Sequence, residues 1–167
     1  PANYPLVMGH EIVGEVIDGD TNGLVKPGAR VLVDPVLYCG TCFHCKQGDT
    51  NLCPNGGIMG REVNGGFADY CIAKTSHIYP LPDELDSKTG AAIQVLTTVL
   101  HAQNKGNLAN GDVVIVSGLG VTGLMHIQLA KARGAKVVVG TSRNAHKREM
   151  ALALGADYAV SHGAEAK

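Results

Sequence analysis

Four cysteines fall within fifteen residues of this chain, and their spacing constrains the fold more tightly than any other feature of the sequence. They follow the pattern C-x2-C-x2-C-x7-C. Four thiolates this close together can close a tetrahedral shell around one zinc ion, without a ligand from a distant part of the chain. Such a shell has no open coordination position, so the ion would hold a loop in shape and take no part in chemistry. The four ligands would be Cys39, Cys42, Cys45 and Cys53.

A pair of disulfides is the alternative to this structural zinc. Disulfides suit small secreted scaffolds, whereas this chain has 167 residues and one further cysteine, Cys71. Reduced, metal-binding cysteines are favoured, and they favour a cytoplasmic setting. A net charge of −1 gives no basic excess for nucleic acid, and no apolar stretch reaches the ~18 residues of a membrane span.

Residues 1–85 are predicted to form a β-rich domain. Short β-like runs over 12–17, 30–33 and 67–73 are separated by turn-forming Gly, Pro and Asn residues. Many short strands with frequent turns are typical of a small barrel or sandwich. The cysteine loop between them is polar and Gly-rich, which predicts no regular structure. We expect Cys71 to pack as a small apolar side chain in the last of these strands.

Residues 86–167 alternate between strand and helix. A helix is predicted from Ser87, as N-cap, to about Gln103. The next predicted elements are a strand over 112–116, a helix from 124 to 133, a strand over 136–141, a helix over 144–154 and a strand from 158. The continuous apolar run over 112–116 is typical of a strand covered on both faces. This order is that of one mononucleotide-binding half of a doubly wound parallel sheet.

A G-x-G-x-x-G motif begins just after the first of these strands and opens the next helix. Within a strand–helix–strand unit, this motif indicates a dinucleotide-binding site. Gly118 would permit the tight turn, and Gly123 would allow the helix to pack closely on the strand. Backbone amides at the helix N-terminus would meet a pyrophosphate, where the helix dipole favours negative charge. Those amides belong to Gly120, Val121, Thr122 and Gly123. A glycine-rich turn without a ligand is the alternative.

The end of the second parallel strand indicates which dinucleotide fits. An Asp or Glu there, about 20 residues after the glycines, would hold the ribose 2′-hydroxyl of NAD. This chain has Thr141-Ser142-Arg143 instead, and its nearest acid is Glu149. Ser142 can donate a hydrogen bond to a 2′-phosphate, and Arg143 can pair with it. Lys147 and Arg148, one helical turn further on, add positive potential. NADP is therefore favoured over NAD. The alternative is that Arg143 is a solvated surface charge beside a Ser that binds either cofactor.

Taken together, these features resemble the zinc-containing medium-chain alcohol dehydrogenases, and the resemblance covers essentially all of the chain. Besides the cysteine loop and the glycine motif, the matching segments are Gly9–Val16, which holds a Gly-His-Glu signature, Lys26–Val31 and Gly65–Tyr70. Ser142-Arg143 with Lys147-Arg148-Glu149 most resembles the NADP-linked members, such as the cinnamyl-alcohol type. The resemblance implies an α/β fold with a β-rich domain. A GroES-like β-barrel domain over 1–85, with its N-terminal part missing, would carry the zinc lobe at 38–54. The first half of a Rossmann doubly wound sheet would follow over 86–167.

The resemblance also implies the catalytic residues. His10 would bind a catalytic zinc ion, and Glu11 would lie beside it as an occasional ligand or as a supporting carboxylate. Thr98 would lie near the nicotinamide. The family's third zinc ligand, a Cys or an acid, falls at Gln94, a neutral oxygen donor that binds zinc poorly. The ion would then be held more weakly, or Glu11 or water would take that position. Outside the family context, His10 would be a structural hydrogen-bonding residue.

The implied activity is reversible hydride transfer between an alcohol or carbonyl substrate and NADP(H), or NAD(H), with zinc polarising the substrate oxygen. The family's first zinc ligand would precede Pro1, and its second mononucleotide half would follow Lys167. We therefore expect this chain alone to be inactive. The full-length parent would be active on a small alcohol, aldehyde or ketone, as a homo-oligomer. Two alternatives stay open: a zinc-free enone or quinone reductase of the same fold, and a non-catalytic NADP-binding protein that keeps only the structural zinc.

Overall fold

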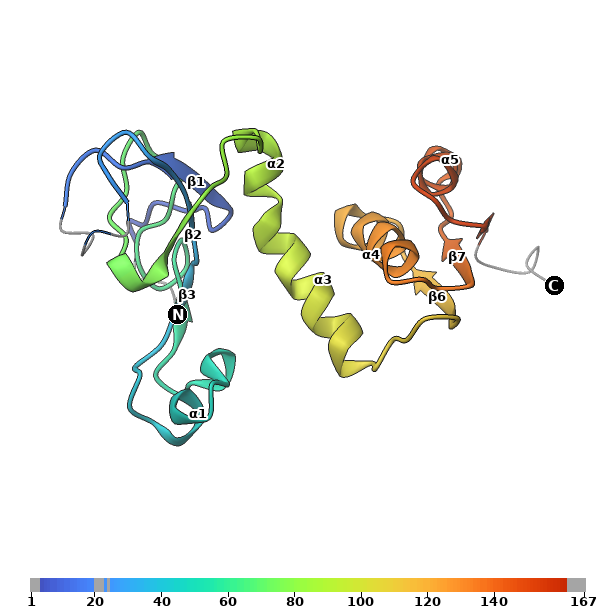
Figure 1. Ribbon diagram of the computed structural model, residues 1–167, viewed down its shortest axis with the longest axis horizontal. Coiled ribbons are helices and arrows are strands. Elements are labelled where there is room, and N and C mark those ends of the chain that lie inside the picture. The colour runs from blue at the N-terminus through green and yellow to red at the C-terminus, as the bar shows by residue number, and fades with distance from the viewer. Residues whose placement is uncertain (1–3, 20–22, 24, 162–167) are drawn as a thin grey trace. The chain divides into compact units, whose positions relative to one another are not determined.

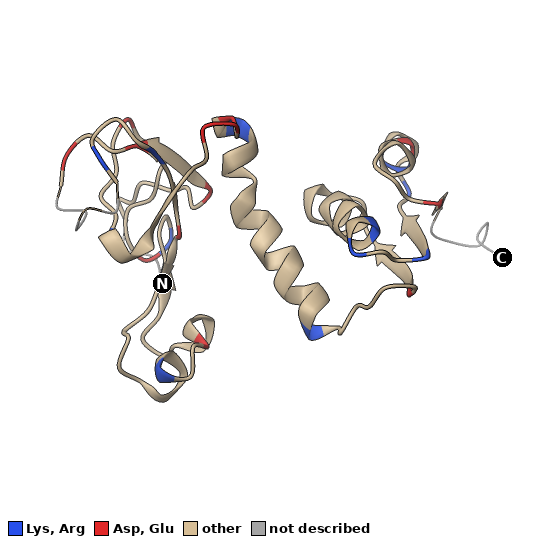
Figure 2. Ribbon diagram, viewed as in Figure 1, with Lys and Arg blue, Asp and Glu red and all other residues tan. Residues whose placement is uncertain are grey.

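The chain folds into two units, residues 1–94 and 95–167, each with a hydrophobic core of its own. The computed structural model describes residues 4–19, 23 and 25–161. Acidic and basic residues are interspersed along both units, as Figure 2 shows. Across the described residues, every helix is too short or too polar to cross a bilayer.

The first unit consists of short strands and single helical turns (Figure 1). Its elements are β1 (Ile12–Glu15), β2 (Arg30–Val33), β3 (Val36–Leu37), α1 (Phe43–Lys46), η1 (Thr50–Leu52), β4 (Gly57–Ile58), η2 (Thr75–His77), β5 (Ile78–Pro80) and α2 (Ser87–Ala91). Strands β1, β2 and β5 form an antiparallel sheet in that order, with Ile12 opposite Val33. Ile12, Val33 and Met59 are buried together and form the core of this sheet.

The cysteine loop leaves the sheet on a short antiparallel ladder between β3 and β4. The prediction that this loop lacks regular structure is wrong, because it contains the helical turns α1 and η1. The sulfur of Cys42 caps α1 by accepting a hydrogen bond from the backbone N–H of Cys45. A thiol therefore plays the part that Ser or Asp plays in an ordinary N-cap. Composition alone gave no sign of this.

Residues 67–73 do not form the predicted strand. Within the described chain, no strand pairs with them, although the backbone N–H of Phe67 donates to Met8. A strand needs a ladder partner, and alternating side chains alone do not supply one. Cys71 is exposed, as are Tyr70 and Ile72, so its prediction as a packed apolar residue is also wrong.

The single helix predicted from Ser87 to Gln103 is two helices, α2 and α3 (Ile93–Lys105), with Ala92 between them. The N-cap is Asp86 rather than Ser87. The Asp86 carboxylate accepts hydrogen bonds from the backbone N–H of Lys88 and Thr89 at 2.9 and 3.0 Å. A third hydrogen bond, from the Thr89 hydroxyl, acts with these two to lower the pKa of the Asp86 carboxyl.

The second unit is a parallel sheet with helices packed against it (Figure 1). Its further elements are β6 (Val113–Ser117), α4 (Val121–Ala132), β7 (Val137–Thr141), α5 (Ala145–Ala153) and β8 (Tyr158–Val160). The strand order is β6-β7-β8, and Ser117 of β6 lies opposite Thr141 of β7. This strand–helix–strand–helix–strand order agrees with the prediction. The carboxyl ends of β6 and β7 therefore lie side by side, where ligands bind in open α/β sheets.

Only one face of β6 is covered in the described chain, so the prediction that both faces are buried is wrong for this strand. Val116 packs with Ile127 and Ala130 of α4, Val138 of β7 and Ala151 of α5 in a single core. The alternate β6 residues Val113 and Ile115 are 66% and 70% exposed. The apolar pattern was read correctly as a parallel strand, but the pattern does not say how much of the chain is present to cover it.

Candidate functional site

The four cysteine sulfurs come together in the lobe between β3 and β4. All four lie within 4.8 Å of one another, and Cys39–Cys45 and Cys42–Cys53 are each 3.9 Å apart. A tetrahedral shell with Zn–S distances of about 2.3 Å has sulfur–sulfur edges of roughly 3.8 Å. A disulfide needs about 2.05 Å, and all four thiols are free. The cluster therefore fits a metal ion, and it does not fit two disulfides.

Backbone amides point at the sulfurs of this cluster. The N–H groups of Cys42, Cys39 and Cys45 donate to the sulfurs of Cys39, Cys53 and Cys42 at 3.3, 3.4 and 3.5 Å. Hydrogen bonds from the Thr41 backbone and hydroxyl, then from the Cys42 backbone, lower the pKa of the Cys39 thiol to about 5. Burial raises the pKa of the Cys45 thiol to about 12. Amide donors stabilise thiolates, which are the form that binds a metal.

The lobe is anchored to the first sheet by a contact that the sequence did not reveal. His77 is buried, its Nδ1 lies 3.3 Å from the backbone oxygen of Asp34, and its ring stacks on Tyr38. Tyr38 directly precedes the first cysteine. The backbone N–H of Asp34 also donates to the oxygen of His77 at 2.7 Å. His77 and Asp34 are 43 residues apart in the sequence, so no local pattern links them.

Close packing of glycine backbones fixes the segment that carries His10. Residues 7–9 and 65–67 are joined by three backbone hydrogen bonds of 2.7, 2.8 and 3.0 Å. Gly9 has φ +101°, and a Cβ on Gly65 would collide with the carbonyl oxygen of Gly9. Gly60 is also close, since a Cβ there would come within 2.6 Å of the Gly9 backbone. Glycine at positions 60 and 65 therefore allows the backbone contact that places His10. In the sequence, the Gly65-Gly66 pair was the visible sign of this close approach.

The predicted catalytic residues lie in different elements. His10 and Glu11 are exposed and immediately precede β1, whereas Gln94 is half-buried in α3. Thr98 is also in α3, and its hydroxyl donates to the backbone oxygen of Val95 at 2.7 Å. Among the described His, Cys, Asp and Glu residues, the cysteine cluster is the only group of three or more with converging ligand atoms. His10 and Glu11 therefore have no third ligand of these types beside them in this part of the chain.

The glycine motif has the conformation of an anion-binding loop. Gly118 has φ +93°, and Gly120 is the N-cap of α4 without a side-chain capping bond. A Cβ on Gly123 would collide with the carbonyl oxygen of Gly118, so only glycine fits there. A Cβ on Gly120 would meet nothing within 4 Å, which leaves open space beside the N-terminus of α4. Free amides and open space suit a pyrophosphate.

The loop after β7 lies directly beside the glycine motif. The backbone N–H of Gly118 donates to the oxygen of Thr141 at 3.0 Å. Ser142 is buried, and its hydroxyl accepts a hydrogen bond from the Asn144 N–H at 3.2 Å. Arg143 and Lys147 are exposed. The residues predicted to bind the pyrophosphate and those predicted to bind the 2′-phosphate thus lie at the same edge of one sheet.

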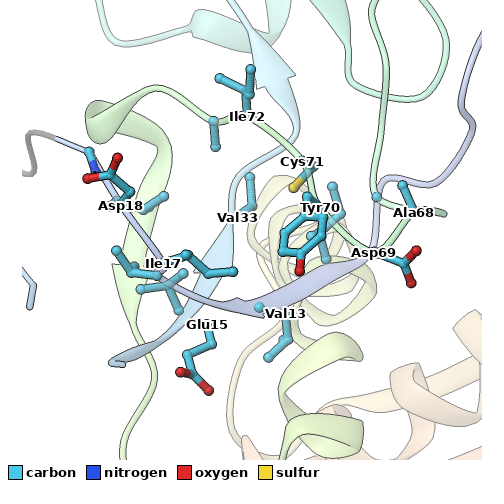
Figure 3. A pocket seen from close by; sticks show the side chains of 18 of the residues that line it. Val13, Glu15, Ile17, Asp18, Val33, Ala68, Asp69, Tyr70, Cys71 and Ile72 are labelled. Carbon is cyan, nitrogen blue, oxygen red and sulfur yellow. The ribbon is translucent and has the colours of Figure 1, made fainter. Parts of the chain in front are cut away.

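An open groove of about 390 Å³ lies in the first unit, between β1 and the segment that follows Gly65. Val13, Ile17 and Tyr70 line it, as Figure 3 shows. It contains none of the predicted catalytic, cofactor-binding or metal-binding residues. Its lining residues are mostly apolar and include Glu15, Asp18 and Asp69, which form no converging ligand set among the described residues.

Two family models match the chain in succession. The model of the alcohol dehydrogenase GroES-like domain matches residues 1–83, and the model of the zinc-binding dehydrogenases matches residues 121–167. Among curated proteins, the D-arabitol-phosphate dehydrogenase of Enterococcus avium is 38% identical over 160 residues, which are 93% of this chain and 46% of that protein. The sorbitol dehydrogenase of Halalkalibacterium halodurans is 34% identical over 163 residues, which are 96% of this chain and 48% of that protein.

Solved structures agree with these matches. One is described as a zinc-binding dehydrogenase of Sinorhizobium meliloti 1021 bound to NADP, with a TM-score of 0.90, 35% identity, and coverage of 96% of this chain and 47% of that one. The chain belongs to the zinc-binding medium-chain dehydrogenases. A structure described as a short chain alcohol dehydrogenase (rspB) of Escherichia coli CFT073 complexed with NADH gives a TM-score of 0.90 at 30% identity, covering 96% of this chain and 48% of that one.

Membership of the zinc-binding medium-chain dehydrogenases confirms the resemblance and the fold class predicted from the sequence. The GroES-like match falls on the β-rich half, and the parallel sheet of the second unit is part of a Rossmann domain. The chain spans about half the length of the curated relatives it matches. One solved structure with NADP bound and one with NADH bound resemble this chain equally well in fold.

Proposed function

We propose that the protein containing this chain transfers a hydride between an alcohol carbon of a small polyol or polyol phosphate and a nicotinamide dinucleotide, with NADP(H) preferred. The observation that carries the proposal is that one chain of this family combines a four-thiol metal shell with an open glycine loop at the N-terminus of α4. The names of the relatives, D-arabitol-phosphate and sorbitol dehydrogenase, motivate the substrate class.

Each group of residues has a separate task in this proposal. The four cysteines hold a structural zinc, and His10, with Glu11 beside it, supplies ligands for a catalytic zinc. When bound, the metal polarises the substrate oxygen and the nicotinamide exchanges the hydride. The N–H groups of residues 120–123 bind the pyrophosphate, and Thr98 lies beside the nicotinamide. Gln94 replaces a thiolate or carboxylate ligand, so we expect the catalytic metal to be held more weakly than in relatives with an acid there.

The cofactor preference rests on the loop after β7. Ser142, Arg143 and Lys147 offer a hydroxyl and two cations, and no carboxylate lies among residues 141–148 to repel a 2′-phosphate. The open helix N-terminus beside this loop would serve NAD(H) as well. Preference for the phosphorylated cofactor is therefore a property of these three side chains.

The proposal extends to the organisation of the protein. We assign the GroES-like domain to residues 1–85 and the dinucleotide-binding domain to residues 86–167. The free thiols favour a reducing, cytoplasmic compartment, and we expect a homo-oligomer. Residues 1–167 in isolation should not complete the reaction, and measurable alcohol oxidation by the isolated chain would contradict this.

The direct test is oxidation of sorbitol, arabitol phosphate and galactitol phosphate by the full-length protein with NADP+ and NAD+, followed by cofactor absorbance. We expect turnover, faster with NADP+, and two zinc ions per subunit. His10→Ala should lower turnover by more than ~100-fold, because even residues that only support zinc ligands contribute 10–100-fold. The same variant should retain the zinc of the cysteine lobe.

Two outcomes would replace the proposal with an alternative. One zinc per subunit, tight NADPH binding and no turnover would indicate a non-catalytic NADP-binding protein. Absence of zinc with reduction of enones or quinones would indicate a zinc-free reductase of the same fold.

A further inference from the structure

Arg148 is tied to the loop after β7 by two hydrogen bonds from one guanidinium nitrogen. Its Nη1 donates to the backbone oxygen of Ser142 at 2.8 Å and to that of Arg143 at 3.0 Å. Arg148 lies in α5 and is half-buried, whereas Arg143 and Lys147 are exposed. Its side chain therefore reaches back from the helix and holds the two residues predicted to contact a 2′-phosphate.

The loop that Arg148 holds is fixed at its other points as well. The backbone N–H of Ser142 donates to Val160 of β8 at 3.1 Å. The side chain of Asn144 caps α5 by accepting from the N–H of Lys147 at 3.1 Å. Between these points, the carbonyls of Ser142 and Arg143 are held by Arg148. The tie thus sets the backbone from which the Ser142 hydroxyl and the Arg143 side chain extend.

The position of this loop means that the two hydrogen bonds from Arg148 can affect ligand binding. The backbone N–H of Gly118 donates a hydrogen bond to Thr141, so residues 142–143 begin next to the open N-terminus of α4. Basic residues colour part of α5 in Figure 2. A loop held in its binding conformation before the ligand arrives loses less conformational freedom on binding. A guanidinium beside it also adds positive potential where a phosphate dianion would lie.

We propose that Arg148 is a positioning residue that makes this site selective for NADP(H) over NAD(H). The inference rests on the proposed function, because it requires that a nicotinamide dinucleotide binds at the glycine loop. The 2′-phosphate needs fixed donors from Ser142 and Arg143, whereas a ribose 2′-hydroxyl needs a single hydrogen bond. Loss of the tie should therefore weaken NADPH binding and leave NADH binding almost unchanged.

The test compares three variants of the full-length protein by calorimetric titration with NADPH and with NADH. Arg148→Met removes the charge and both hydrogen bonds at similar side-chain length, and Arg148→Lys keeps the charge and the ability to donate to carbonyl oxygens. Arg133→Met is the matched control. Arg133 also binds a backbone carbonyl, that of Leu108 at 3.2 Å, and the Asn104 side chain at 2.8 Å, but at the far end of α4 from the glycine loop.

Arg148→Met should weaken NADPH binding about tenfold, as expected for lost hydrogen bonds to a charged donor, with NADH affinity within about threefold of the wild type. Arg148→Lys should recover most of the NADPH affinity. Arg133→Met should lower the melting temperature and leave the ratio of the two affinities unchanged. The melting temperature of each variant separates loss of folding from loss of selectivity.

Two results would overturn the inference. Equal weakening of NADPH and NADH binding by Arg148→Met, or no change in either affinity, would show that Arg148 does not set the selectivity and would leave the proposed function intact. Binding of neither cofactor by the wild-type protein would overturn the proposed function together with the inference.

Discussion

At the scale of single residues, the position of His10 depends on three glycines, whose lack of a side chain lets their backbones approach closely. Gly9, Gly60 and Gly65 meet backbone to backbone, and each would need a shift of its neighbours to accept a methyl group. Gly9 and Gly60 also have φ of +101° and +80°, which L-residues with a Cβ rarely adopt. The exposed His10 follows directly, so its direction is set by this contact rather than by packing of its own ring.

We predict that Gly65→Ala lowers the free energy of unfolding by about 1–3 kcal/mol, the usual cost of forcing an extra methyl group into a closely packed place. The new Cβ would overlap the carbonyl oxygen of Gly9. Urea denaturation of the full-length protein measures the effect. Gly14→Ala is the control, because a Cβ at that β1 position meets nothing within 4 Å. An equal loss in both variants would show that the change acts through the strand and not through the Gly9 contact.

At the scale of elements, one carboxylate joins a helix to two strands of the parallel sheet. Asp157 precedes β8 and accepts a hydrogen bond from the N–H of Val138 in β7 at 2.7 Å. Lys131 of α4 donates to both of its oxygens at 3.1 Å. The Val138 N–H, followed by the Lys131 ammonium, lowers the pKa of the Asp157 carboxyl below its ordinary value of 3.8.

This lowered pKa predicts a pH-dependent contribution to stability. The folded state favours the carboxylate, so the contribution is fully present above the ordinary pKa of 3.8 that the unfolded chain has, and it is lost as the pH falls through the lower folded pKa. We expect Asp157→Asn to lower the melting temperature at neutral pH and to flatten its fall below about pH 4. Thermal unfolding from pH 2 to 7 measures this, with the exposed Glu84→Gln as control. An acid limb as steep in Asp157→Asn as in the wild type would contradict the prediction.

At the scale of the whole molecule, the sequence predicted what local spacing determines. The alternation of apolar runs over 113–160 indicated the parallel unit, and the cysteine spacing indicated the metal shell. The sequence pattern did not predict contacts between segments that are distant in the chain. Residues 67–73 alternate like a strand but have no ladder partner in the described chain, and Val113 and Ile115 of β6 are apolar but uncovered. The tie from Arg148 across the β7–α5 loop likewise depends on side-chain direction, which spacing does not give.

The measurement that tests the account most directly is zinc X-ray absorption on the reduced full-length protein, combined with zinc content. We predict one zinc ion per subunit surrounded by four sulfurs at about 2.3 Å, and a second zinc whose ligands include the imidazole nitrogen of His10. Serine in place of Cys42 should remove the four-sulfur signal, whereas serine in place of the exposed Cys71 should leave it unchanged. A zinc shell without sulfur, or Cys39, Cys42, Cys45 and Cys53 joined to one another in disulfides, would contradict the account.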